Sequence, residues 1–156
     1  MRTILTKGLI ALAITAIAAL GADNSIGTWK LNVEKSKYIP APMPVKSLVV
    51  TREASDGGVK VTITGEQADG TTLNASYTAK YDGKDVQITG NAPFDTISIK
   101  QVNANTLTDA RKKTGGSYHA TSRIVISNGG KTMTTITKGT NNEGKEFTST
   151  FVSDKQ

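Results

Sequence analysis

Apolar and polar residues alternate along most of the chain after residue 28. Val59, Val61 and Ile63 share one face of their segment, with polar residues between them, and residues 72–81 show the same two-residue period. This period is typical of strands with one buried face. It predicts about ten strands: 29–33, 47–53, 59–64, 73–81, 86–89, 96–102, 106–112, 118–127, 132–138 and 146–152.

Short segments rich in Gly, Asn and Asp separate these strands. Such residues tolerate the positive φ angles of tight hairpin turns. The predicted turns are Asp56-Gly57-Gly58, Asp69-Gly70, Asp82-Gly83, Thr114-Gly115-Gly116, Asn128-Gly129-Gly130 and Asn141-Asn142-Glu143-Gly144. No segment after residue 21 has a sustained helical apolar stripe, so we predict an all-β, antiparallel, up-and-down arrangement. A sandwich remains an alternative, but a barrel of about 8–10 strands is favoured because closure removes exposed edges.

One connection is longer than the others. Residues 34–46 contain Tyr38 and prolines at 40, 42 and 44, which fix the backbone and remove hydrogen-bond donors. We therefore expect neither a helix nor a central strand there, but a strap after the first strand. It is either a lid over one mouth of the barrel or an ordered crossover that plugs one end.

The first residues have the order of a secretory signal peptide. Arg2 and Lys7 precede a run at 8–20 that is apolar or small except for Thr15. A retained membrane anchor needs about 20 apolar residues, more than this run provides. We expect a signal peptide at 1–21, a single β-barrel domain at 22–156, a periplasmic or extracellular location and no stable membrane insertion after cleavage.

Composition narrows the choice of partners. The net charge of +6 falls to +4 without residues 1–21, because Arg2 and Lys7 are lost with no acidic residue. The basic residues are dispersed, and the densest cluster, 111–113, lies beside a predicted turn, so we expect no nucleic-acid partner. The chain has no cysteine, so burial and hydrogen bonding must stabilise the fold without disulfides.

The sequence offers no evident catalytic arrangement. His119 is the single histidine, which excludes a histidine-rich metal site, and its place in a strand favours a solvent-facing side chain. No nucleophile-elbow motif occurs, and Glu53, Glu66, Asp95 and Asp109 have surface charge as their default role. We therefore expect a non-enzyme without metal or cofactor; an axial haem ligand at His119 is a minor alternative.

One polar set could lie inside the barrel. Asp109 and Arg111 share the face of Leu107, and Arg123 is on the following strand. If that face points inward, each guanidinium needs an anionic partner, either Asp109 itself or a bound anionic small molecule. We expect the candidate ligand-binding residues to be Tyr77, Arg111, Arg123, Tyr118 and Phe151, with Tyr81 and Phe147 as further apolar lining.

The opening Gly27-Thr28-Trp29-Lys30-Leu31 resembles the first strand of lipocalins and intracellular fatty-acid-binding proteins, the calycin superfamily. With Asn32, residues 35–38, the proline strap and Lys46-Ser47, the chain is more closely similar to small secreted bacterial lipocalin-like proteins without assigned activity. The resemblance implies a small hydrophobic or amphipathic ligand.

The departures from these families are as informative. Residues 34–46 are too few for the helix-turn-helix lid of fatty-acid-binding proteins, and Ser149-Thr150-Phe151 stands where their Arg-x-Tyr pair would bind the carboxylate. Lipocalins pack a late arginine across the first-strand tryptophan; Arg111 and Arg123 are candidates for that position. Biotin-binding barrels have several pocket tryptophans, whereas Trp29 is the single one here.

Trp29 is expected to be a buried plug at one end of the barrel rather than a ligand contact.

Two functional hypotheses follow. The first hypothesis is a secreted protein that binds a small apolar or amphipathic molecule without catalysis. The alternative is a structural or protein-interaction module that acts through its surface and has no internal ligand.

Overall fold

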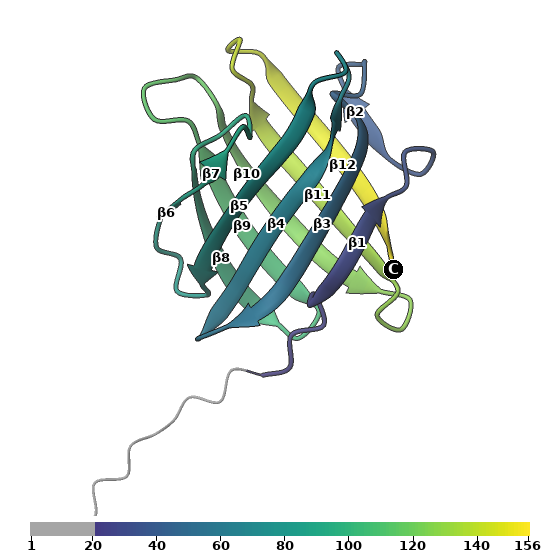
Figure 1. The fold of residues 1–156 in the computed structure, drawn as a ribbon, viewed down its shortest axis with the longest axis vertical. Coiled ribbons are helices and arrows are strands. Elements are labelled where there is room, and N and C mark those ends of the chain that lie inside the picture. Colours follow the sequence, from purple (N-terminus) through teal and green to yellow (C-terminus); the bar gives the residue numbers. More distant parts are fainter. Residues whose placement is uncertain (1–20) are drawn as a thin grey trace, which may run out of the picture.

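The computed structural model describes residues 21–156, which form twelve β-strands and no helix (Figure 1). The prediction of an all-β antiparallel barrel is confirmed. The strands are β1 (Gly27–Leu31), β2 (Lys37–Ile39), β3 (Val45–Ser55), β4 (Gly58–Gln67), β5 (Thr72–Lys80), β6 (Val86–Gln87), β7 (Thr89–Gly90), β8 (Thr96–Asn103), β9 (Thr106–Lys112), β10 (His119–Ser127), β11 (Thr132–Thr140) and β12 (Glu146–Lys155).

Most neighbours in the barrel are also neighbours in the sequence. Strands β3, β4 and β5 pair as consecutive antiparallel hairpins, as do β8 to β12. The first strand, β1, lies between β12 and β3 and joins the two sets, so the first and last strands pair in one sheet (Figure 1). Short turns impose this order, because a hairpin places each strand beside the one before it.

The barrel is nearly closed, and its weakest join lies between β5 and β8. There β6 pairs with β8 and β7 pairs with β5, with two residue pairs in each ladder. Buried side chains from both sides pack together at this join: Val59, Val61, Tyr77, Ala79, Ile97 and Ile99. We call the join between β5–β7 and β6–β8 the seam.

Alternation positions the interior side chains as the sequence predicts. In β10, Ala120, Ser122, Ile124 and Ile126 are buried, while Arg123 is exposed. In β5 the buried residues again fall at every second position. Successive side chains of a strand point to opposite faces, so one face of each strand lines the barrel and the other meets solvent.

The strap is shorter than predicted. Residues 37–39 form β2 and pair with Thr148–Thr150 of β12, and β3 already begins at Val45, which leaves 40–44 without regular structure. The prolines at 40, 42 and 44 explain that remainder, because they cannot donate to a ladder. The sequence predicted no central strand within 34–46; β2 pairs on one side only, with β12, whereas Val45 and Lys46 already belong to β3.

Candidate functional site

The barrel interior contains a cavity of about 170 Å³. Its lining is largely apolar and comes from strands around the barrel, with Leu48, Val50, Ile63, Met133 and Phe151 among the contributors. Three charged side chains also face it: Arg52, Asp109 and Arg111. An apolar cavity with a few polar groups is the usual form of a small-molecule site, although such sites commonly measure about 300–1,000 Å³.

Asp109 and Arg111 form an ion pair inside the barrel, as the sequence predicts for an internal pair. Arg111 Nη2 lies 2.8 Å from Asp109 Oδ2, and Asp109 is 6% exposed. The two residues are neighbours on the inward face of β9 because they are two positions apart. Burial is the largest single influence on the pKa of Arg111 and lowers it, but the charge and hydrogen bond of Asp109 together with Tyr118 and Tyr77 hold that pKa above its usual value.

A second interior arginine, Arg52, was missed by the sequence reasoning. It is 4% exposed, and its Nε donates a 3.0 Å hydrogen bond to Ser25 Oγ. The alternation of the sequence does indicate its inward position, because Leu48, Val50 and Arg52 follow the two-residue period and all line the cavity. An arginine in such a series is easily assigned to the surface, since arginine is almost never fully buried without a partner.

Three polar atoms at the cavity have no hydrogen-bond partner among the described residues. They are Arg52 Nη2, Asp109 Oδ1 and Arg111 Nε, and all three are inaccessible to solvent. Buried polar groups are paired in the large majority of cases, because an unpaired one loses its hydration without compensation. Two donors and one acceptor on the charged residues of the cavity lining are therefore buried without compensation.

The closed end of the barrel is built on Trp29. This residue is 0% exposed, packs with Leu107, Ile124, Ile126 and Met133, and donates a 2.8 Å hydrogen bond from its indole to the Ser25 carbonyl. Trp29 is not among the residues lining the cavity, in agreement with its predicted role as a plug.

A lysine occupies the place expected for an arginine over this tryptophan. Lys155 Nζ lies 5.1 Å from the Trp29 ring centroid, so Arg111 and Arg123 were the wrong candidates. A side chain at Gly27 would put its Cβ 2.6 Å from Lys155 Cε, and the φ of Gly27 is +133°. The glycine of the Gly-Thr-Trp opening thus leaves room for the lysine.

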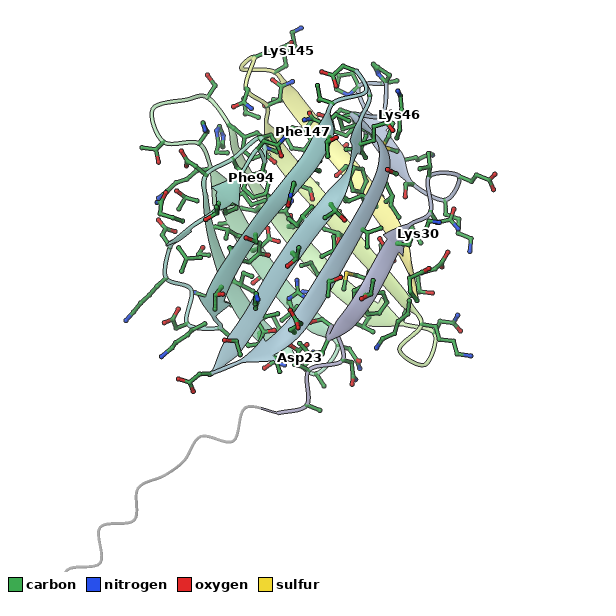
Figure 2. All side chains as sticks on the ribbon, in the orientation of Figure 1. Asp23, Lys30, Lys46, Phe94, Lys145 and Phe147 are labelled. Carbon is green, nitrogen blue, oxygen red and sulfur yellow. The ribbon has the colours of Figure 1, made fainter. Side chains whose placement is uncertain are left out.

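An aromatic layer covers the opposite end of the cavity. Phe94 and Tyr118 stack with centroids 5.5 Å apart, Tyr38 and Phe147 stack at 5.4 Å, and Tyr118 contacts Phe147 at 6.0 Å. Figure 2 shows Phe94 and Phe147 towards the end of the barrel away from Asp23. The guanidinium of Arg111 lies 5.2 Å from the Phe94 centroid, which connects this layer to the charged residues.

The structure brings most of the predicted site residues together. Tyr77, Arg111 and Phe151 line the cavity, and Tyr118 belongs to the aromatic layer above it. Burial raises the pKa values of Tyr77 and Tyr118, while Arg52 opposes the shift at Tyr77 and Arg111 opposes it at Tyr118. Both tyrosines therefore stay protonated near neutral pH and can donate hydrogen bonds.

Arg123 is the exception, and its proposed place in the interior is wrong. In the ladder between β9 and β10, Ser122 lies opposite Asp109, and Arg123 lies opposite Thr108. Arg123 consequently shares the outward face of β10 and is exposed. Its side chain cannot contribute to the cavity.

His119 lies on the exterior, as expected. Its Nδ1 is 3.0 Å from the Ser117 carbonyl oxygen, and its Nε2 is 3.4 Å from Thr140 Oγ1. Its ring nitrogens thus contact a backbone carbonyl and a threonine hydroxyl. Within residues 21–156 there is also no helix of the length and hydrophobicity needed to cross a membrane.

Fold and site together define an antiparallel β-barrel with a small, partly charged internal cavity. Comparison with protein-family models finds no match to the chain, and comparison with curated protein sequences finds none either.

Proposed function

We propose that this chain is a secreted, lipocalin-like protein that binds a small amphipathic molecule in its barrel without catalysing a reaction. The observation that carries the proposal is the internal cavity, in which apolar side chains surround Arg52, Asp109 and Arg111. Barrels of this kind can enclose one small ligand when side chains do not fill the interior. Export is part of the proposal and rests on the pattern of residues 1–21 alone, which lie largely outside the described residues.

The size of the cavity also supports a second candidate, a module acting through its surface. At about 170 Å³ the cavity is smaller than the usual small-molecule pocket. In that case water would hydrate the interior charges, and the exposed threonine-rich faces of the strands would carry the function.

Native mass spectrometry of the protein purified from its own host separates these candidates. We expect a mass increment from a retained small molecule that disappears on denaturation. A panel of small apolar and amphipathic compounds should then raise the melting temperature of the stripped protein in a concentration-dependent way. An unchanged mass together with no thermal response across the panel would rule out the binding function and favour the surface module.

A further inference from the structure

The interior of the barrel has more positive than negative charge. Of the charged residues lining the cavity, two are arginines and one is an aspartate. Asp109 already pairs with Arg111, whereas Arg52 forms no ion pair with a described carboxylate. Asp23 lies beyond Ser25, accepts a 2.6 Å hydrogen bond from its hydroxyl, and also accepts one from the Tyr81 hydroxyl. Arg52 is thus a buried cation whose nearest described hydrogen-bond partner is neutral.

The unpartnered donors belong to the same two arginines. Arg52 Nη2 and Arg111 Nε come from β3 and β9, and both side chains line the one cavity. Tyr77 and Asp109 line the same cavity, so the four residues surround a common region. Guanidinium groups bind oxyanions through directed N–H donors. A carboxylate would supply acceptor oxygens for the two free donors and the one negative charge that the cavity lacks.

We infer that the ligand is a small monocarboxylate whose headgroup is held by Arg52 and Arg111 and whose apolar part lies against the aliphatic and aromatic lining. This inference rests on the proposed function and specifies its chemistry. A single negative charge balances the excess cation, and the apolar side chains Val50, Ile63 and Met133 favour an organic acid over an inorganic ion.

The volume of the cavity limits the length of the acid. A cavity of about 150 Å³ accommodates a molecule the size of benzene, and the present one measures about 170 Å³. A chain of about six carbons therefore fits, whereas a long-chain fatty acid would have to displace lining side chains. Asp109 Oδ1 is a free acceptor beside the headgroup, so an acid that also carries a hydroxyl group satisfies one more buried atom.

Isothermal titration calorimetry of the stripped protein near neutral pH tests whether the ligand must be negatively charged and how long its carbon chain can be. The probes are butyrate, hexanoate, octanoate and palmitate, with hexanamide as the neutral counterpart of hexanoate. We expect hexanoate to bind at least about tenfold more tightly than hexanamide, because the amide carries no charge to balance Arg52. Palmitate should bind more weakly than hexanoate.

Three variants test the residues. Arg52→Gln should weaken hexanoate binding about 30-fold or more, as expected for losing one partner of a buried charge pair. Arg111→Lys keeps a cation beside Asp109 but removes the free Nε, and should weaken binding about tenfold. The matched control is Arg123→Gln, which removes the same charge from the exposed face of β10 and should leave binding unchanged. Near-ultraviolet circular dichroism of Trp29 checks that each variant is folded.

Each result of these experiments supports or overturns the inference. Preference for hexanoate, lost in Arg52→Gln, supports the inference. Equal binding of hexanoate and hexanamide by the unmodified protein overturns it while the proposed function stands, and this comparison holds even if a variant fails to fold. A neutral molecule retained from the host would likewise overturn the inference and leave the proposed function in place. No binding of any probe, with no retained ligand, overturns both the inference and the proposed function.

Discussion

Ser25 is a single residue that connects the buried Trp29 with the charged residues of the cavity. It is 1% exposed; its carbonyl accepts the Trp29 indole hydrogen bond and its hydroxyl accepts one from Arg52 Nε. The same hydroxyl donates to Asp23, which also accepts a hydrogen bond from Tyr81. One residue thus contacts both Trp29, through its backbone carbonyl, and Arg52, through its hydroxyl.

Ser25→Ala should destabilise the protein by about 2 kcal/mol. The variant keeps the backbone carbonyl that holds Trp29, but it removes the only described partner of Arg52 Nε and leaves a buried, charged donor unpaired. Urea unfolding monitored by Trp29 fluorescence measures the change. Ser127→Ala is the control, because Ser127 is exposed in β10 and should change the unfolding free energy by less than about 0.5 kcal/mol. Equal stabilities of the two variants would show that the Ser25 hydroxyl does not support Arg52.

Some of the candidate site could be predicted from residue spacing, and some could not. The Asp109–Arg111 pair follows from two positions on one strand face, and the structure confirms it. Arg52 follows the same rule, but the other residues of β3 that line the cavity are apolar, so the sequence does not show which charge it meets. The role of Ser25 was hidden, because it precedes the first predicted strand and acts through contacts between residues far apart in the chain.

The seam is the feature that matters most at the scale of strands. Strands β6 and β7 contain two residues each, while the neighbouring hairpins have ladders of seven or more residues. Hydrogen bonds in such short ladders open without breaking the rest of the sheet, so local opening should be easiest there. Tyr77 and Ile97 line the cavity and pack at this join, which brings the seam next to the proposed ligand.

Amide hydrogen exchange should therefore be fastest at the seam. We expect the amides of 86–90 to exchange about a hundredfold or more faster than those of Ile124 and Ile126 in β10, after correction for intrinsic rates. Nuclear magnetic resonance of the protein in deuterated buffer measures both sets at once. Equal protection would mean that the side-chain cluster holds the seam as firmly as the continuous ladders hold β10.

Strands and turns were the most predictable elements, for a physical reason. Alternation and positive-φ turn residues are local signals, and the turn at Asn128-Gly129-Gly130 shows positive φ at all three positions. The short strand β2 was missed because the prolines after it dominate the local pattern, while its partner Thr148–Thr150 is far away in sequence. The seam could not be predicted, since alternation reveals the face of a strand and not its distant neighbour.

At the scale of the whole molecule, the barrel protects its tyrosines from ionisation. Burial raises the pKa values of Tyr38, Tyr77, Tyr81 and Tyr118. For Tyr81, burial is the largest cause, followed by its hydrogen bond to Asp23, and together they raise its pKa to about 12. An unfolded chain has no such protection, so its tyrosines ionise near pH 10.

The protein should therefore lose stability as the pH rises from about 10 to about 12. In this interval the unfolded chain has released its tyrosine protons while the folded barrel retains them, so the free energy of unfolding falls with increasing pH. Urea unfolding at several pH values measures the slope. Tyr81→Phe should be less stable near neutral pH, because the hydrogen bond to Asp23 is lost, yet its stability should fall less steeply above pH 10. The unmodified protein provides the comparison, since both proteins share every other titrating group. Equal slopes of the unfolding free energy against pH would show that Tyr81 ionises as readily in the barrel as in the unfolded chain.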